Sequence, residues 1–186
     1  MYYRQFGDID RLHKVFPALC AYAKWWKLNR TWPNGTYWSS GWGTGMDNTP
    51  RVPEGYNQIF SNGHMEWLDA NLQQMLVNES LLQIGFYIER WQEIEEVEDE
   101  NRFLKKHIND FMWNDAEGFL FDRYADGSLG TAKGIYAYWA LQTDVLGKER
   151  LDRFVAHLSD STEFDRPHRV PSLSADHRKY NALGRY

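Results

Sequence analysis

The stretch TWPNGTYWSSGWGTGMDNTPR, residues 31–51, separates two segments of helical character. It contains three tryptophans, four glycines and a single carboxylate, Asp47. Glycine permits backbone conformations that a Cβ atom forbids and proline fixes φ, so this composition predicts an irregular loop. A hydrophobic core has little use for many glycines beside many indoles. A carbohydrate site uses both, because flat apolar rings stack on sugar faces and a flexible backbone can hold one acid at the reacting bond, so we place the candidate chemistry at Asp47.

Apolar residues recur every three or four positions on both sides of this loop, which predicts a mostly helical protein. Helices are expected at about residues 9–30, 63–93, 98–113, 131–146 and 148–158. Helices that alternate with loops in this way favour an all-α fold of antiparallel helix pairs, either an (α/α) toroid or a helical array.

Local signals refine these helices. Pro17 should kink or split the first of them. The acidic run EIEEVEDE, residues 93–100, is typical of a solvated helix end or connection. Thr131 and Gly147 are expected to cap the two ends of the fourth helix.

The connections carry the more informative residues. Phe119 and Phe121 alternate between turn-forming residues, which predicts a short hairpin or extended turn. We expect the loops at residues 31–51, 113–130 and 163–186 to converge at one end of the helix pairs.

Composition bounds the class of protein. At 186 residues, with 42% hydrophobic and 25% charged residues, the chain is expected to form one soluble domain. The net charge of −5 and the lack of a basic patch argue against nucleic acid as a partner. No apolar run approaches the roughly 20 residues that span a bilayer, which argues against a membrane protein. The N-terminus lacks a signal-peptide pattern, which favours a cytoplasmic location.

Other chemistries find little support. Gly41-Trp-Gly-Thr-Gly45 lacks the third glycine of a dinucleotide-binding loop, and no strand precedes it. The histidines show no metal-ligand spacing, and Asp122 and Asp126 favour a turn over a calcium loop. We therefore expect no cofactor and no metal. Asp47 itself has a structural alternative, because Asp-Asn-Thr-Pro is typical of a turn capped by side chains.

Five segments together resemble one enzyme family. They are WWKLNR (25–30), GMDNTPR (45–51), FMWNDAEGFLFDR (111–123), KGIYAYWAL (133–141) and RPHRVPSLSADHRKYN (166–181). In this order they are similar to the (α/α)₆-barrel inverting glycosidases related to trehalase, processing α-glucosidase and mannosylglycerate hydrolase. The GMDN-x-P-R and RVPSLS segments are the specific parts of the resemblance, and the helices between them are generic.

The resemblance implies a role for Asp47. In that family the aspartate of GMDN is the general acid, which protonates the glycosidic oxygen as the bond breaks. We expect Trp38 and Trp42 to offer ring faces to the sugar, and Asn48 and Arg51 to hydrogen-bond its hydroxyls.

The second carboxylate activates water from the opposite face of the sugar, roughly 6.5–9.5 Å from the first in inverting enzymes. The family's base is a late glutamate, beyond a tryptophan-rich segment that should follow Tyr186.

The resemblance also implies a partial barrel. The family's barrel has about twelve helices, and this chain is expected to supply about five or six of them. We therefore expect residues 1–186 to be part of a single glycosidase-like barrel domain that is truncated at its C-terminus and begins abruptly at its N-terminus. Half a toroid would leave apolar helix faces uncovered, so we expect a markedly apolar exposed face and self-association.

The leading functional hypothesis is hydrolysis of an α-glycosidic bond in a small saccharide by an inverting two-carboxylate mechanism. A second hypothesis is a non-catalytic carbohydrate-binding module or an inactive fragment, because the expected base lies outside this chain. A third is a helical interaction domain, which buried Trp38 and Trp42 side chains and the lack of a pocket near Asp47 would favour.

Overall fold

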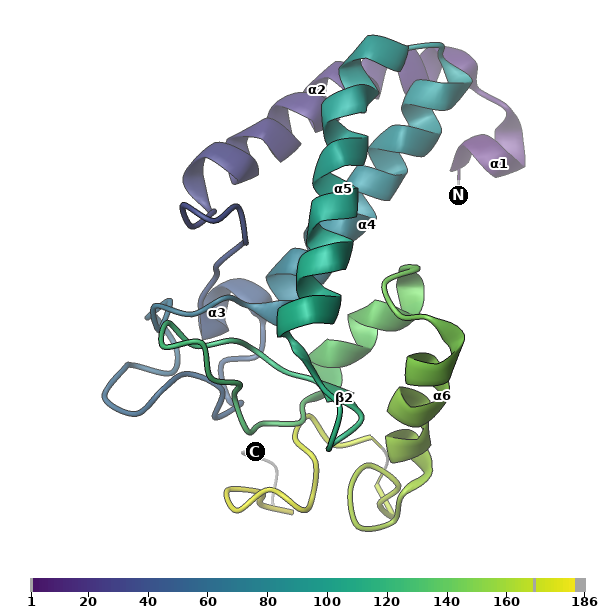
Figure 1. The fold of residues 1–186 in the computed structure, drawn as a ribbon. Coiled ribbons are helices and arrows are strands. Elements are labelled where there is room, and N and C mark those ends of the chain that lie inside the picture. The colour runs from purple at the N-terminus through teal and green to yellow at the C-terminus, as the bar shows by residue number, and fades with distance from the viewer. Residues whose placement is uncertain (1, 169, 183–186) are drawn as a thin grey trace.

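The computed structural model describes residues 2–168 and 170–182 (Figure 1). Three long helices form the upper part of the molecule: α2 (Ile9–Asn29), α4 (Leu68–Tyr87) and α5 (Trp91–Phe111). The antiparallel pair α4 and α5 is the most extensive helix contact, and α2 packs against α4. The short helix α1 (Tyr2–Phe6) precedes α2.

Helix α2 is continuous, although Pro17 lies inside it. The Asp8 side chain caps its first turn by accepting a hydrogen bond from the Arg11 backbone N–H. Leu12, Phe16 and Ala23 are buried with Leu81 in one hydrophobic cluster. This packing spans the position of Pro17, so the expected split does not occur.

Helix α4 begins five residues later than the expected position 63 and ends at Tyr87. Gly63 has φ 64° and His64 has φ 47°, which are left-handed conformations that a right-handed helix cannot contain. Glu89, with φ 58°, likewise separates α4 from α5.

Helix α5 begins at Trp91, so the acidic run is helical and the expected start at 98 was wrong. Ile94 and Val97 pack toward the cluster around Leu81, which gives this segment enough apolar contact to be a helix. Gly85 of α4 lies against Ile94, where an added Cβ would come within 2.3 Å of the Ile94 Cγ2. The glycine therefore allows close approach of the two helices.

The hairpin expected near Phe119 is present. Strands β1 (Trp113–Asn114) and β2 (Phe119–Leu120) pair antiparallel, with Trp113 opposite Leu120. Residues 119–121 are all buried, so this segment is a core hairpin without alternation between buried and exposed side chains.

The expected α-helix at 131–146 was wrong. It is a 3₁₀ helix, η1 (Ile135–Gln142), and neither Thr131 nor Gly147 caps it. Gly134 forms an isolated β-bridge with Leu173, which keeps the chain extended just before η1. Gly147 instead precedes α6 (Lys148–Ala156), which continues into the 3₁₀ turn η2 (His157–Ser159) and so confirms the expected helix at 148–158.

Contacts between distant loops assemble the lower part of the molecule (Figure 1). Glu66 forms a β-bridge with Arg123, so the loop before α4 lies beside the segment after β2. Lys133 is buried and pairs with Glu163 and Asp176, which holds the C-terminal segment against the start of η1.

The loops therefore gather at one end, opposite the α4–α5 turn, as expected for the described residues; residues 169 and 183–186 lie outside them. The described chain is mostly helical with one two-stranded sheet, which agrees with the coarse fold class, and the toroid stays a prediction. In the part of the chain that the structure describes, every helix is too short or too polar to span a bilayer.

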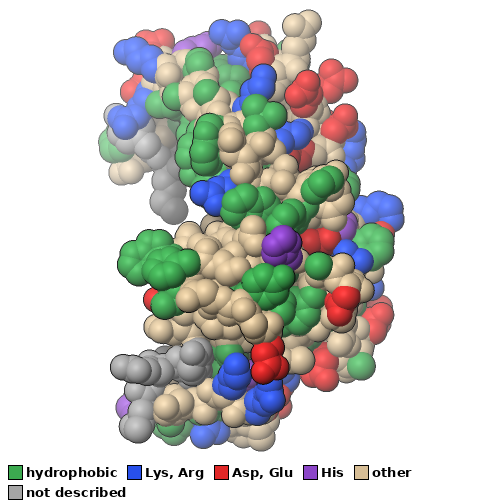
Figure 2. Space-filling view, turned by 90° about the vertical axis from the view of Figure 1, so that its left-hand side faces the viewer, with side chains coloured by type: hydrophobic (Ala, Val, Ile, Leu, Met, Phe, Trp, Pro, Cys, Tyr) green, Lys and Arg blue, Asp and Glu red, His purple; other side chains and the backbone are tan. Residues whose placement is uncertain are grey.

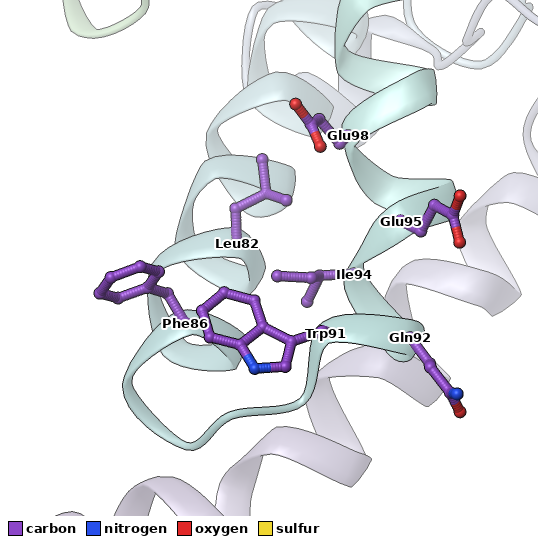
Figure 3. A pocket seen from close by; sticks show the side chains of 7 residues that line it. All are labelled: Leu82, Phe86, Trp91, Gln92, Ile94, Glu95 and Glu98. Carbon is purple, nitrogen blue, oxygen red and sulfur yellow. The ribbon is translucent and has the colours of Figure 1, made fainter.

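Apolar side chains are exposed on several helices, as expected for a partial barrel. Along α2 they include Leu19, Tyr22, Trp25 and Leu28. At the α4–α5 turn the rings of Phe86 and Trp91 meet edge to face and line an open pocket (Figure 3). Self-association through such surfaces stays a prediction.

Candidate active site

The loop that carries Asp47 folds around a single helical turn, α3 (Gly41–Thr44). The Ser40 hydroxyl caps this turn by accepting a hydrogen bond from the Gly43 backbone N–H. Gly45 ends it in the left-handed conformation, at φ 70°. Gly41 is buried, and an added Cβ there would lie 2.4 Å from the Gln58 carbonyl oxygen and 3.0 Å from the Asp47 Cα. The glycines thus bring the backbone of Asp47 close to the loop at residues 52–64.

Asp47 is half-buried, and its carboxylate has no hydrogen-bond or ion-pair partner among the described residues. Asn48 beside it is exposed. Trp42 is 70% exposed, and its ring centroid lies 6.2 Å from that of Phe60, which is also exposed. The structure therefore offers a carboxylate without a described partner on the same loop as the exposed Trp42, whose ring contacts Phe60 of the following loop.

Trp38 belongs to a different group of rings. It is half-buried, packs against Trp32 at 5.9 Å and lies under the Arg30 guanidinium at 4.6 Å. Its described ring contacts are with these residues, whereas those of Trp42 are with Phe60. The two tryptophans thus occupy separate aromatic clusters.

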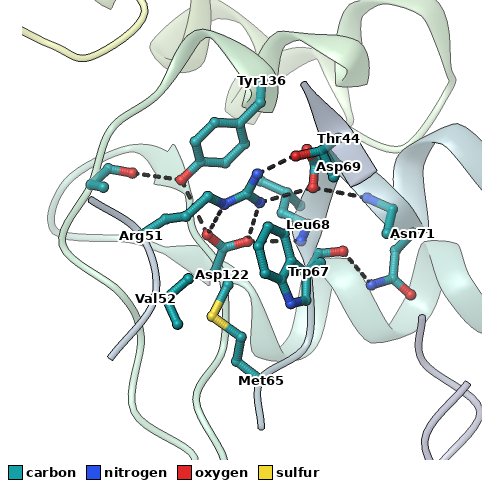
Figure 4. A network of polar contacts seen from close by, with 12 residues as sticks. Thr44, Arg51, Val52, Met65, Trp67, Leu68, Asp69, Asn71, Asp122 and Tyr136 are labelled. Atoms are coloured by element: carbon teal, nitrogen blue, oxygen red, sulfur yellow. Dashed lines mark hydrogen bonds and ion pairs between the residues drawn. The ribbon is translucent and has the colours of Figure 1, made fainter. Parts of the chain in front are cut away.

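Arg51 is at the centre of a buried ion-pair network (Figure 4). Its side chain is 1% exposed. Nη1 and Nη2 donate to the two Asp69 carboxylate oxygens, each at 2.8 Å. Nε and Nη2 donate to the Asp122 oxygens at 2.8 and 2.6 Å. We call Arg51, Asp69 and Asp122 the arginine clamp.

Two rings complete the surroundings of the guanidinium. The Trp67 ring centroid is 4.4 Å from the Arg51 Cζ, and that of Tyr136 is 3.6 Å away. The Asp122 carboxylate also accepts the Leu68 backbone N–H at 2.9 Å, at the start of α4. The clamp therefore joins the Asp47 loop, the first turn of α4 and the segment after β2.

The charges in the clamp are unequal, with one guanidinium between two buried carboxylates. Burial raises the pKa of Asp69, and the negative charge of Asp122 adds to this effect against the opposing pull of Arg51. The two carboxylates raise the pKa of Arg51 despite the burial that opposes its charge, so Arg51 stays protonated. Ion pairing with aspartate thus engages four of the five N–H groups of Arg51, which sequence analysis had expected to contact sugar hydroxyls.

Sequence reasoning missed most of the clamp. Asp122 was interpreted as a turn residue, but it is 2% exposed and ion-paired. Asp126 does form the expected turn, accepting hydrogen bonds from Ser128. The available signal was that Asp122 directly follows a run of buried apolar residues, where a carboxylate requires a cationic partner.

Comparison with known proteins identifies the family. The model of the mannosylglycerate hydrolase MGH1-like glycoside hydrolase domain matches residues 1–186, and the chain belongs to this family. An uncharacterized protein of Borreliella burgdorferi is 24% identical over 186 residues, covering 98% of this chain and 36% of that protein. The chain thus spans about a third of the length of this curated relative.

Two solved structures are similar in fold. One, a chain described as a sialidase, has a TM-score of 0.81 at 17% identity and covers 96% of this chain and 16% of its own. The other is an uncharacterized conserved protein from Thermus thermophilus, with a TM-score of 0.74 at 16% identity, covering 93% of this chain and 52% of its own. At such low identity, these likenesses concern the fold alone.

Proposed function

We propose that this chain is part of the catalytic domain of a glycoside hydrolase that cleaves an α-glycosidic bond in a small saccharide with inversion. Asp47 is the general acid, and the general base comes from sequence outside these residues. Family membership over residues 1–186 supports the reaction class. The observation that carries the assignment of Asp47 is its half-buried carboxylate, which has no partner among the described residues and lies on the same loop as the exposed Trp42.

The chemistry needs a proton at the leaving oxygen. In an inverting mechanism the protonated acid donates it as the bond breaks, while a carboxylate across the ring activates a water molecule. Because the clamp holds the guanidinium of Arg51 against Asp69 and Asp122, this residue of the same loop does not pair with the Asp47 carboxylate.

The same site supplies groups for binding. Trp42 offers an exposed indole face, and Asn48 offers an exposed amide for sugar hydroxyls. In this proposal Trp38 contributes from the neighbouring aromatic cluster. Arg51 acts as a positioning residue that anchors the C-terminal end of the Asp47 loop.

The experiment is hydrolysis of a panel of α-glucosides and α-mannosides by the complete protein that contains this chain. The Asp47→Asn variant should lose about 10²–10⁴-fold in kcat, the usual contribution of general acid catalysis, while saccharide binding persists. The matched control is Asp126→Asn, because an asparagine oxygen can still accept the hydrogen bonds of that exposed turn.

Three results would decide the matter. Loss in Asp47→Asn alone supports the proposal. Full turnover in Asp47→Asn would show that Asp47 is a turn residue. Saccharide binding without hydrolysis in the natural protein would favour the carbohydrate-binding module.

A further inference from the structure

A second cavity lies on the loop end of the molecule, apart from the Trp42–Phe60 pair. It has a volume of about 340 Å³ and is lined by side chains from three loops, including Trp32, Asn34, His64, Glu66, Arg123 and Tyr124. We call it the Trp32 pocket. Figure 2 views the side toward which these loops project and shows hydrophobic side chains gathered across its middle.

One wall of the Trp32 pocket is aromatic. The His64 ring stacks on Trp32, with centroids 5.8 Å apart and planes 25° from parallel. Tyr56 continues the row at 5.7 Å from His64. Trp32 is fixed by a hydrogen bond from its Nε1 to the Met65 carbonyl oxygen at 2.8 Å. The wall thus presents an anchored indole next to an exposed imidazole.

The backbone of His64 is unusual. Its φ of 47° is rare for a residue with a side chain, and such conformations gather at functional sites. The Asn62 side chain stabilises this turn by accepting the His64 backbone N–H. The turn places an exposed imidazole at the lining of the cavity.

Polar side chains joined by hydrogen bonds also line the pocket. The Glu66 carboxylate is buried and accepts hydrogen bonds from Asn34 at 2.7 Å and from Arg123 Nη1 at 2.9 Å. Burial opposes its charge, but hydrogen bonds from His107 and Asn34 and the charge of Arg123 lower the pKa of Glu66. Its ionised form therefore holds Arg123 in place.

Arg123 retains donors for a ligand. Only its Nη1 donates to a side chain, and its Nε and Nη2 have no hydrogen-bond partner among the described residues. Nη2 lies beside Gly127, where an added Cβ would come within 3.3 Å. A guanidinium that keeps such donors and lines the same cavity as an indole and an imidazole is suited to a flat polyhydroxylated ring.

We propose that the Trp32 pocket is a second, non-catalytic carbohydrate site that binds one pyranose unit of a saccharide. The sugar face lies on Trp32 and His64, and its hydroxyls accept hydrogen bonds from Arg123. The charge of Arg123 is offset by Glu66, which favours a neutral sugar over an anionic ligand.

The pocket is connected to the Asp47 loop. The Tyr124 hydroxyl donates to the Arg51 carbonyl oxygen at 3.1 Å, and the loop at residues 52–64 carries both Tyr56 and Phe60. The pocket and the Trp42–Phe60 pair are therefore joined through the loop at residues 52–64. The inference does not require that Asp47 be catalytic.

The test measures binding of methyl α-D-glucopyranoside, methyl α-D-mannopyranoside and maltose to the complete protein by calorimetry and ligand-observed NMR. His64→Gly removes the ring but tolerates the positive φ. Arg123→Lys keeps a cation for Glu66 but removes the free planar donors. Each variant should weaken saccharide binding at the Trp32 pocket by about tenfold, as expected for the loss of one ring contact or one donor group.

Two controls separate this site from others. Trp42→Ala should weaken saccharide binding at the proposed active site and leave binding at the Trp32 pocket unaffected. Trp91→Ala, at the α4–α5 turn, should leave saccharide binding at both sites unchanged. Thermal unfolding of each variant reports whether the fold is kept.

The outcomes are distinct. Weakened binding in both His64→Gly and Arg123→Lys, with Asp47→Asn binding like the natural protein at this site, supports the proposal. Unchanged affinity in both variants, or a natural protein that binds none of the three sugars, overturns it. Failure of the proposed function would appear differently, as hydrolysis that survives Asp47→Asn.

Discussion

Arg51 and Asp47 share the short segment GMDNTPR, yet their surroundings are opposite. Arg51 is fully buried, and two aspartates and two rings fix its position. Asp47 is half-buried, and its carboxylate has no partner among the described residues. Buried contacts fix Arg51 at one end of the segment, whereas the carboxylate of Asp47 makes no such contact among the described residues.

The two environments bear on the proposed role of Asp47. A catalytic group needs a supporting shell that fixes its backbone, while its own atoms stay free for substrate. In this proposal the arginine clamp supplies that shell at one end of the loop, and the close approach of Gly41 to the Asp47 backbone supplies it at the other.

Arg51→Met should have the largest effect on stability. It leaves Asp69 and Asp122 buried without a cation, and breaking a buried ion pair costs about 3–5 kcal/mol. The free energy of unfolding in urea measures the loss. Arg90→Met removes an exposed pair with Glu93 and should change it by less than about 1 kcal/mol. Equal losses of unfolding free energy in Arg51→Met and Arg90→Met would contradict the claim that the buried ion pairs stabilise the fold more than the exposed pair.

Gly41→Ala should have an intermediate effect. The new Cβ would lie 2.4 Å from the Gln58 carbonyl oxygen and 3.0 Å from the Asp47 Cα, so the loop must shift. We expect a loss of about 1–3 kcal/mol in unfolding free energy and a fall in hydrolysis by the complete protein. Gly147→Ala, where a Cβ meets nothing within 4 Å, is the control and should cost about 0.5 kcal/mol. A fully active, stable Gly41→Ala would show that the loop is not held as described.

Glu66→Gln should produce the smallest effect, visible as a pH dependence. The folded-state pKa of Glu66 is lowered, so its contribution to stability is present above the usual value of 4.5 and is lost as pH falls through the folded value. The difference in unfolding free energy between the natural protein and Glu66→Gln should therefore shrink from pH 6 to pH 3. A difference that stays constant or grows toward acid pH would contradict a lowered pKa of Glu66 in the folded state. Glu98→Gln on the exposed face of α5 is the control.

Several elements of the fold could be predicted from the local pattern of apolar and turn-forming residues. The periodicity of α2 and α6 and the hairpin at Phe119 were predictable because each depends on residues close in sequence. Helix η1 was misassigned because its geometry depends on the bridge between Gly134 and Leu173, a contact between distant segments. The early start of α5 also depends on packing, since Ile94 fits against Gly85 of α4.

The candidate site was likewise only partly predictable from the sequence. The segment around Asp47 was recognisable from its composition and its resemblance to a family. The partners of Arg51 were not, because Asp69 and Asp122 are distant in sequence and each resembles an ordinary helix or turn residue. The Trp32 pocket likewise exists only because three loops meet.

The most direct test of the central claim compares leaving groups in the complete protein and its Asp47→Asn variant. An alkyl α-glycoside needs protonation of its leaving oxygen, whereas an α-glycosyl fluoride needs little acid assistance. If Asp47 is the general acid, Asp47→Asn should lose about 10²–10⁴-fold on the alkyl glycoside and less than about tenfold on the fluoride. Equal losses on both substrates would contradict the account, because they would mean that Asp47 only maintains the loop.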